Sequence, residues 1–571
     1  MLPLHQLKDL QYHKILQFLE RSLRIGRNDR VSPARILAAA YAAVRLWEGA
    51  DGRSLEAFLA GETDSELAAF LHEQLGAVWE RVRDAYTAFE EDMFAAFLLF
   101  DNVLTDRPEM QETPESLAQL AIRLLDPAPG MQTVDFGAGW GRFLRELAVS
   151  GHGAGSIGYE IEKEARCIAK MRTALMPDVT IAGEDVLRIP AGEPQFDRIF
   201  LHPTFRGRIQ DVHDTGNVGL CLLEQRLPVV KQTLSPDWMY VAAALQHLKE
   251  DGRLVCLVTN GATLSVSDRE VRHWLLESGM LETVIALPPR MLEYSIVFVT
   301  MLVLSHGNKE TTYVDATPFF EMGRACNVLT EKHIDAILQA VETPGEHSVR
   351  LTPDVLAAHE DMLAPERLIA MQTVGRMEGA VPMGDLILRV TRGTQLRADV
   401  LDELQSETPT PFRFAMLSDM RDGMLSPRMR YLQYIDRRLE RYCVPHHALL
   451  IAKNGIPIKS VVAEIPPGER VLANGNIYII TLDERQVEPY YIKAYLDSPK
   501  GANALKAMCV GITLQNLTLE GLRALRIPMP PLDVQHRIAI RYRTILFEIQ
   551  AKKQELETLT ASLSDVWEEM G

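Results

Sequence analysis

The glycine-rich stretch at residues 133–144, TVDFGAGWGRFL, constrains the fold more than any other part of this 571-residue chain. Apolar residues lead into Asp135, and three glycines follow at every second position, Gly137, Gly139 and Gly141. This pattern predicts a strand that ends in a tight turn and opens a helix. Glycines let backbone N–H groups approach a ligand without a Cβ clash, and the start of the helix adds donors. The spacing alone is also compatible with an ordinary tight turn.

Three more strand-like segments follow in chain order, and each ends in polar or glycine residues. The segment 155–162 ends near Glu160, at about the 20-residue distance from the glycines at which a carboxylate can accept hydrogen bonds from ribose hydroxyls. VTIAGEDVL places Asp185 after a third strand, and FDRIFLHPTF carries HPTF at residues 202–205. Four strand ends in this order predict one edge of a doubly wound, Rossmann-like α/β sheet, where such folds bind ligands.

This series resembles that of S-adenosylmethionine-dependent methyltransferases, and more narrowly the adenine-N6 DNA methylase subunit of type I restriction-modification systems. Thr113-Pro114 matches the Thr-Pro pair that precedes the cofactor site in that family, and the segment 275–305 resembles its later strands. The resemblance covers roughly residues 111–310 and implies S-adenosylmethionine as the cofactor. It implies that Glu160 holds the ribose and Asp185 the adenine amino group. The implied cofactor-binding residues are Thr113, Asp135, Gly137, Gly139, Gly141, Glu160 and Asp185.

The catalytic motif of that family is Asn-Pro-Pro followed by an aromatic residue, and this chain departs from it. In the family, the Asn side chain and the first Pro carbonyl accept hydrogen bonds from the amino group of the base, and the aromatic ring stacks on the flipped base. The corresponding catalytic residues here are His202, Pro203, Thr204 and Phe205. A neutral His202 offers one acceptor nitrogen, whereas a protonated one would repel the positive charge that develops on the amine.

Two functions remain open on this sequence. One is a sequence-specific DNA adenine-N6 methyltransferase of a restriction-modification or phage-defence system. The other is a catalytically weak or inactive methyltransferase-like subunit for DNA recognition or assembly, because Thr204 lacks the rigidity of the second proline of the motif.

The sequence before and after the strand series predicts further domains. Residues 1–110 have apolar residues at three- and four-residue spacing, which predicts a helical domain that packs on the next one. In the resembled family this domain also helps to clamp DNA. Residues 111–340 alternate strands and helices, which predicts the methyltransferase domain, with a mostly parallel sheet of about seven strands. Residues 341–380 form a connector.

From residue 381 the chain changes to short strands and turns. Four segments resemble parts of one target-recognition domain of a type I specificity subunit, which predicts an α+β domain at residues 381–531 and double-stranded DNA as a partner: MGDLILRVTRGTQL, HALLIAKNGIPIKSVVA, EPYYIKAYLDSPKGANAL and VGITLQNLTLEGLRALRIPMPPLDVQHRIA. Basic residues interleaved with tyrosines could pair with phosphates or read guanine edges, although they are also compatible with a solvated charged face. The predicted DNA-binding residues are Arg421, Arg428, Arg430, Lys453 and Lys459.

Residues 532–571 predict a long helix with a heptad seam. Apolar residues recur at alternating four- and three-residue steps, and Lys552 takes the one skipped position: Ile538, Tyr542, Ile545, Ile549, Leu556, Leu559, Leu563 and Val566. A seam with one polar interruption favours a coiled coil with a second copy or with a partner specificity or restriction subunit. The alternative is a helix that lies on its own domain.

Cysteine usage, apolar runs and net charge limit which other classes of protein this chain can belong to. The six cysteines are scattered without a Cys-x-x-Cys pair, and His446-His447 lacks partners at ligand spacing, so we expect neither a disulfide framework nor a metal site. No signal peptide is recognisable, and the longest apolar run is far shorter than the ~20 residues of a membrane span, so we expect a cytoplasmic protein without a membrane contact. With a formal net charge of −17, DNA contacts must come from local patches or partner subunits.

Overall fold

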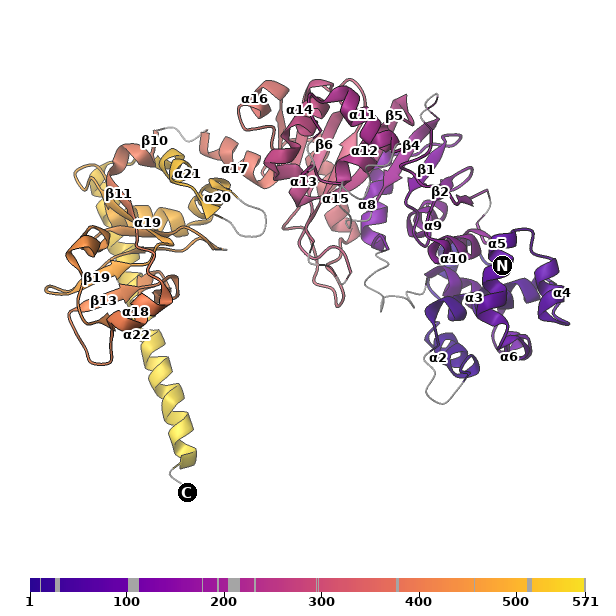
Figure 1. Cartoon of the computed structure of the whole chain (residues 1–571), viewed down its shortest axis with the longest axis horizontal. Coiled ribbons are helices and arrows are strands. Elements are labelled where there is room, and N and C mark those ends of the chain that lie inside the picture. Colours follow the sequence, from indigo (N-terminus) through magenta and orange to yellow (C-terminus); the bar gives the residue numbers. More distant parts are fainter. Residues whose placement is uncertain are drawn as a thin grey trace. The chain divides into compact units, whose positions relative to one another are not determined.

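The structure, a computed structural model, describes residues 1–10, 12–25, 31–100, 112–176, 178–190, 192, 195–203, 216–230, 233–293, 295, 297–375, 379–455, 457–510 and 516–568. The chain divides into two compact units, Met1–Pro365 and Glu366–Gly571, and each is described by itself. Figure 1 draws the first from indigo to pink and the second from orange to yellow. None of the described helices combines the length and the apolar character that a bilayer crossing demands.

The first unit begins with packed helices: α1 (Leu4–Leu7), α2 (His13–Ser22), α3 (Pro33–Trp47), α4 (Leu55–Ala60), α5 (Ser65–Leu75), α6 (Trp79–Ala85) and α7 (Glu91–Phe100). Helix α3 is buried on nearly every side, because its alanines let neighbouring helices approach closely. Its first turn is fixed by Pro33 and by the Ser32 hydroxyl, which accepts a hydrogen bond from the backbone N–H of Arg35 at 3.2 Å. The predicted N-terminal helical region is confirmed.

The sheet of the first unit has nine strands among the described residues, in the order β3-β2-β1-β4-β5-β7-β6-β8-β9. They are β1 (Thr133–Phe136), β2 (Ile157–Tyr159), β3 (Thr180–Ala182), β4 (Phe196–Leu201), β5 (Leu248–Thr259), β6 (Leu281–Ala286), β7 (Val299–Leu304), β8 (Thr311–Asp315) and β9 (Ser348–Leu351). Strands β1 to β5 are parallel, and β7 runs antiparallel between β5 and β6. The predicted doubly wound α/β sheet is confirmed.

Two further strands at one side of the sheet, β8 and β9, make it larger than the seven strands expected. Strand β8 pairs in parallel with β6, and β9 pairs antiparallel with β8. Strand β9 falls within the predicted connector, and its four residues are too few for periodicity to reveal a strand. Helices of this region are α8 (Glu115–Leu125), α9 (Arg142–Val149), α10 (Lys163–Thr173), α11 (Val218–Arg226), α12 (Asp237–Leu245), α13 (Asn260–Leu264), α14 (Arg269–Glu277), α15 (Glu331–Glu342) and α16 (Pro353–Ala357).

The N-terminal helices and the sheet share one hydrophobic core. Leu37 of α3, Phe143 of α9 and Ile168 of α10 belong to the same buried cluster. Ion pairs reinforce this contact, because Glu66 of α5 accepts hydrogen bonds from Arg166 and Lys170 of α10. The helices therefore pack directly against the elements that follow the glycine turn.

The second unit has two four-stranded sheets, β11-β20-β17-β18 and β12-β16-β13-β19. Its strands are β10 (Ala380–Pro382), β11 (Ile387–Arg392), β12 (Gln405–Ser406), β13 (Phe412–Ala415), β14 (Met420–Arg421), β15 (Met424–Leu425), β16 (Arg430–Leu432), β17 (Leu449–Ala452), β18 (Ser460–Val462), β19 (Arg470–Ala473), β20 (Ile477–Leu482), β21 (Cys509–Val510), β22 (Asn516–Leu517) and β23 (Arg526–Pro528). Its helices after α17 (Pro365–Gly375) are α18 (Ala398–Leu404), α19 (Pro489–Asp497), α20 (Pro499–Ala507), α21 (Leu519–Ala524) and α22 (Leu532–Glu568). This is the α+β architecture predicted for the second half.

Helix α22 packs on its own domain at its beginning, and the coiled coil that its seam predicts stays a prediction. At its beginning, Ala539 and Leu546 are buried in the core of the second unit. The Tyr542 hydroxyl, at a predicted seam position, donates to Asp497 of α19, so this part lies on its own domain. Other seam residues remain exposed: Ile538, Ile545, Ile549, Leu556 and Leu559. The side chains of Leu563 and Val566 lie outside the described part of the chain.

Candidate active site and DNA interface

The glycine turn after β1 is the tight turn that its sequence predicts. All three of its glycines have positive φ, at +90°, +53° and +83°, which residues with a Cβ rarely adopt. The N–H of Gly137 donates to the carbonyl oxygen of Tyr159 at the end of β2, at 3.0 Å. A Cβ on Gly137 would lie 3.4 Å from the carbonyl oxygen of His202, so the turn lies directly against the end of β4. Two predicted site segments are therefore neighbours.

Two carboxyl groups lie at this edge of the sheet. Asp135 is 2% exposed, and its Oδ1 has no hydrogen-bond partner among the described residues. Burial, and then the charge of Glu160, raise the pKa of Asp135 well above its ordinary value. Glu160 accepts the N–H of Gly139 on one oxygen and the N–H of Glu162 on the other, each at 2.8 Å. A buried carboxyl oxygen without a hydrogen-bond partner is costly, so Oδ1 of Asp135 suits a ligand that brings a donor or a positive charge.

Asp185 follows β3 at the same edge, but its carboxylate also serves its own turn. One oxygen accepts the backbone N–H of Leu187 at 2.9 Å. The other lies 3.4 Å from the Nε of Arg188. The side chain remains 28% exposed, so it is accessible from solvent while it stabilises this turn.

The two bulky residues of the glycine turn, Trp140 and Arg142, are both buried and engaged away from its ligand-facing edge. Trp140 is 4% exposed and belongs to the core of the first unit. Arg142 forms an ion pair with Glu112, and Arg172 of α10 reaches the other oxygen of Glu112 at 2.8 Å. Burial alone would raise the pKa of Glu112, but the two guanidinium groups outweigh it and lower this pKa to about 2. The result is a buried ionic clamp, Glu112 with Arg142 and Arg172, directly before Thr113.

Thr113 and His202 meet at the end of β4, although 89 residues separate them. The Thr113 hydroxyl oxygen lies 2.7 Å from Nδ1 of His202. Burial lowers the pKa of His202 to about 4, so the ring is neutral at pH 7. Pro203 follows in the described chain, whereas Thr204 and Phe205 lie outside the described residues. A neutral imidazole is the one state of His202 that can accept a hydrogen bond from an amino group.

The structure brings some of the predicted DNA-binding residues together and separates others. Arg421 on β14 and Lys459 before β18 donate to neighbouring carbonyl oxygens, those of Ser418 and Leu417, at 2.6 and 3.4 Å. These two cations share one exposed turn.

The other predicted cations lie apart from that turn. Arg430 is exposed on β16, in the sheet β12-β16-β13-β19, whereas β18 belongs to the sheet β11-β20-β17-β18. Arg428 lies 3.8 Å from Glu557 of α22, and both side chains are exposed. Lys453 is partly buried at the opposite end of the loop that leads to Lys459. The five predicted DNA-binding residues, all of them described, thus lie at several places of the second unit.

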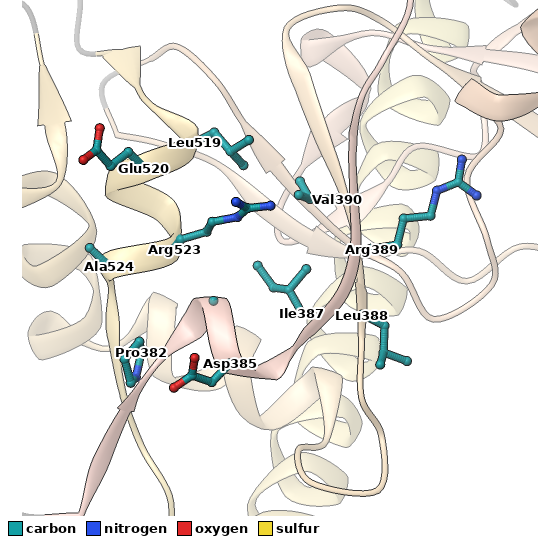
Figure 2. Close-up of a pocket in the computed structure, with 11 residues that line it drawn as sticks. Pro382, Asp385, Ile387, Leu388, Arg389, Val390, Leu519, Glu520, Arg523 and Ala524 are labelled. Carbon is teal, nitrogen blue, oxygen red and sulfur yellow. The ribbon is translucent and has the colours of Figure 1, made fainter.

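A depression of about 760 Å³ lies between β11 and α21 of the second unit. Figure 2 shows Arg523 reaching from α21 towards the strand, whereas Arg389 points away from the depression. Asp385 and Glu520 line it as well, so the formal charge of the four ionisable side chains is zero. This balance does not favour an anion.

A neighbouring depression of about 540 Å³ follows β11 beyond Val390. It is lined by Arg392 and Arg441, with Thr394 and the ring of Tyr442 beside them. With two guanidinium groups and a hydroxyl donor, this depression suits a phosphate better than the first depression, whose ionisable side chains have no net charge.

Glu464 joins His446 and His447, a neighbour that their spacing in the sequence did not reveal. The Nε2 atoms of the two histidines lie 3.8 and 3.9 Å from one Glu464 oxygen. However, Nδ1 of His446 accepts the backbone N–H of Ile465 at 3.1 Å. The neutral His446 ring therefore carries its proton on Nε2, the atom that would have to bind a metal. The contacts to Glu464 are longer than hydrogen bonds, and the ligand atoms of the three residues lie within 4.8 Å of one another, but the hydrogen bond from Ile465 argues against metal ligation through Nε2 of His446.

Comparison with protein families agrees with this layout. Residues 111–359 match the family N-6 DNA Methylase. Residues 436–561 match the family Type I restriction modification DNA specificity domain. The chain joins an N-6 DNA methylase domain to a type I DNA specificity domain. The resemblance seen in the sequence is confirmed for both halves.

Solved structures of low sequence identity match parts or most of this chain. The type IIG restriction endonuclease BpuSI matches 95% of this chain and 74% of its own, with 11% identity and a TM-score of 0.50. The type I methyltransferase subunit of Streptococcus thermophilus matches 59% of this chain and 80% of its own, with 18% identity and a TM-score of 0.47. The EcoKI M protein, a type I restriction enzyme subunit, matches 63% and 88%, with 16% identity and a TM-score of 0.33.

The site residues distribute over these two domains. All predicted cofactor-binding and catalytic residues fall within the methylase match. Lys453 and Lys459 fall within the specificity match, whereas Arg421, Arg428 and Arg430 precede it.

Sequence reasoning missed Glu112 in the methylase domain and Arg392 at the end of β11. The Arg-Gly pair between two threonines, TRGT, is the local signal that could have pointed to Arg392. Glu112 carries no such signal, since its partners come from α9 and α10.

Proposed function

We propose that this chain transfers a methyl group from S-adenosylmethionine to the N6 amino group of adenine in a defined DNA sequence, within a cytoplasmic restriction-modification or phage-defence system. One observation carries the proposal: a neutral His202, hydrogen-bonded to Thr113, lies against the glycine turn. The acceptor that the reaction needs is thereby next to the turn that would hold the methyl donor.

The residues at this edge fit S-adenosylmethionine. The unpartnered Oδ1 of Asp135 suits a donor or positive charge, and Glu160 is placed at the end of β2 where ribose hydroxyls would lie. A Cβ added to Gly139 would meet nothing within 4 Å, so the turn is open on that side. When bound there, the cofactor supplies an electrophilic methyl group.

The protein side of the reaction is positioning and hydrogen bonding. An adenine inside a duplex is out of reach, so it has to leave the stack. Neutral His202 and the carbonyl oxygen of Pro203 would accept hydrogen bonds from its amino group and orient the nitrogen lone pair towards the methyl group. Because His202 is neutral, it adds no positive charge against the developing ammonium. Phe205, outside the described residues, is the proposed stacking ring.

The specificity domain would select the sequence. Arg421 and Lys459, which share an exposed turn of this domain, are proposed to contact DNA phosphates. Arg392 and Arg441 provide a second candidate in the depression beside β11. The exposed seam of α22 would pair with a second copy or with a partner specificity or restriction subunit.

A second function rests on a specific departure. His202 offers one acceptor nitrogen where the family has an amide, and Thr204 replaces a proline. Loss of one preorganised hydrogen-bond partner costs on the order of 10²–10³-fold in rate. The alternative is therefore a methylase-like subunit that recognises DNA or assembles partners with weak or no transfer.

The deciding experiment is transfer of labelled methyl groups from S-adenosylmethionine to unmethylated genomic DNA by the full chain. We expect labelled N6-methyladenine, and its loss in His202→Ala. The combined variant His202→Asn with Thr204→Pro separates the alternatives. A large gain over an inactive parent supports the recognition subunit, whereas loss of an existing activity shows that the native residues serve the reaction.

A further inference from the structure

The contact between Thr113 and His202 admits two hydrogen-bond arrangements. If the Thr113 hydroxyl donates to Nδ1, the neutral ring carries its proton on Nε2. If Nδ1–H donates to the hydroxyl oxygen, the lone pair is on Nε2 instead. The 2.7 Å separation fits either arrangement, so the chemistry that the ring has to perform decides between them.

Thr113 is held from both sides along the chain. On one side, Glu112 is fixed by Arg142 and Arg172, in a clamp that is only 14% exposed at its carboxylate. On the other side, Pro114 is the N-cap of α8 and has a fixed φ. The Thr113 side chain is itself buried and β-branched, so its hydroxyl has few rotamers. The clamp, Pro114 and the restricted rotamers together fix the position of the Thr113 hydroxyl oxygen.

His202 is held equally firmly. Strand β4 pairs with β1 up to the partners Phe136 and Leu201, the residue before the histidine. The carbonyl oxygen of His202 faces Gly137 so closely that a Cβ there would come within 3.4 Å. Neither partner of the hydrogen bond can move away without disturbing the sheet or the glycine turn.

We propose that Thr113 is a positioning residue that accepts the Nδ1–H of His202 and thereby presents Nε2 as the hydrogen-bond acceptor for the adenine amino group. This inference rests on the proposed function. In the plane of the base, the amino group offers only N–H donors. The other tautomer of His202 would point its Nε2–H donor at these N–H donors. Thr113 thus makes Nε2 of His202 a hydrogen-bond acceptor. The side-chain carbonyl oxygen of an asparagine is an acceptor without such a partner. This role differs from the cofactor contact that the resemblance implied for Thr113.

The first test is the tautomer itself, which needs no turnover. The ¹⁵N resonances of the full chain, labelled in histidine and assigned with His202→Gln, distinguish a protonated from an unprotonated ring nitrogen. We expect Nδ1 protonated and Nε2 unprotonated at pH 7, and loss of this preference in Thr113→Val. A proton on Nε2 of the unaltered protein would overturn the inference even if the chain methylates DNA.

The second test is a double-substitution cycle on methyl transfer. Thr113→Val should lower kcat about 10- to 100-fold without weakening S-adenosylmethionine binding, and Thr113→Ser should restore most of that loss. In a His202→Asn background, Thr113→Val should cost far less, because an amide needs no tautomer. Thr283→Val, a buried threonine of β6, controls for the Thr-to-Val change.

Two outcomes of the cycle contradict the inference. One is a loss of equal size whether Thr113→Val is introduced into the unaltered chain or into the His202→Asn variant. The other is a raised Kd for S-adenosylmethionine in Thr113→Val with kcat unchanged, which would assign Thr113 to the cofactor. If the unaltered chain transfers no methyl group at all, the proposed function fails, and the ¹⁵N measurement still decides the tautomer.

Discussion

The carboxylate of Glu160 accepts a hydrogen bond from the backbone N–H of Gly139 at 2.8 Å, so the acidic end of β2 is joined to the glycine turn after β1. The same carboxylate is the proposed ribose acceptor. Glu160→Ala should therefore weaken S-adenosylmethionine binding about 10-fold, which corresponds to about 1.4 kcal/mol. Glu160→Gln keeps an acceptor oxygen and should lose less. Titration calorimetry measures both, and equal affinities of the Ala variant and the unaltered chain would contradict the assignment.

His202 should make stability depend on pH. Its folded pKa, about 4, lies below the ordinary value of 6.5 because of burial. As the pH falls through 6.5, the unfolded state takes up a proton that the folded state refuses, so the folded state loses stability until the pH reaches about 4. Between pH 7 and 5 the loss is about 1–2 kcal/mol.

The histidine contribution can be isolated by substitution. Burial also lowers the pKa of His247, which acts in the same direction. The difference between the unaltered chain and His202→Gln, measured by denaturant unfolding at each pH, isolates His202. Parallel curves for the two proteins from pH 7 to pH 5 would show that His202 is not held neutral by folding.

The clamp at Glu112 should be a major stabilising contact of the first unit. Glu112→Gln leaves Arg142 and Arg172 buried without their carboxylate, which should cost about 3–5 kcal/mol. The matched control is Asp335→Asn, which breaks the exposed pair with Arg123 and should cost less than about 1 kcal/mol. Thermal unfolding compares the two variants, and similar midpoints would contradict a clamp of this strength.

The exposed seam of α22 should mediate association. Leu556→Glu combined with Leu559→Glu places charges on two exposed seam positions, 64% and 59% exposed, and should convert an oligomer into a monomer. Ile540→Glu is the control, because Ile540 is 67% exposed but lies off the seam. Light scattering with size-exclusion chromatography gives the masses. A monomeric unaltered chain at micromolar concentration would leave only a partner subunit as the occupant of the seam.

The sequence predicted the parts of the site that are local and could not predict those that are not. The turn at Gly137 and the acidic residue Glu160 follow from one strand-turn-helix signal, and both lie at the predicted sheet edge. The pairing of Thr113 with His202 depends on how distant segments return to one place. Strand β9 was missed because four residues carry no periodicity.

Charged residues show the same difference. Arg172 lies in α10, where a basic residue of an amphipathic helix is ordinarily solvated. In the fold it is 1% exposed and paired with Glu112, and burial lowers its pKa to about 10. The contact between Glu464 and the pair His446-His447 likewise arises only from the fold. Such long-range pairs require the tertiary structure, because no spacing along the chain reports them.

The most direct measurement of the central claim is a base-resolution map of N6-methyladenine in the genome of a host that expresses this chain, together with any partner subunit it requires. We expect adenine methylation at one sequence motif, which disappears when His202→Ala replaces the unaltered chain. A genome without methylated adenine that depends on this chain, in a host where the protein binds S-adenosylmethionine and DNA, would contradict it.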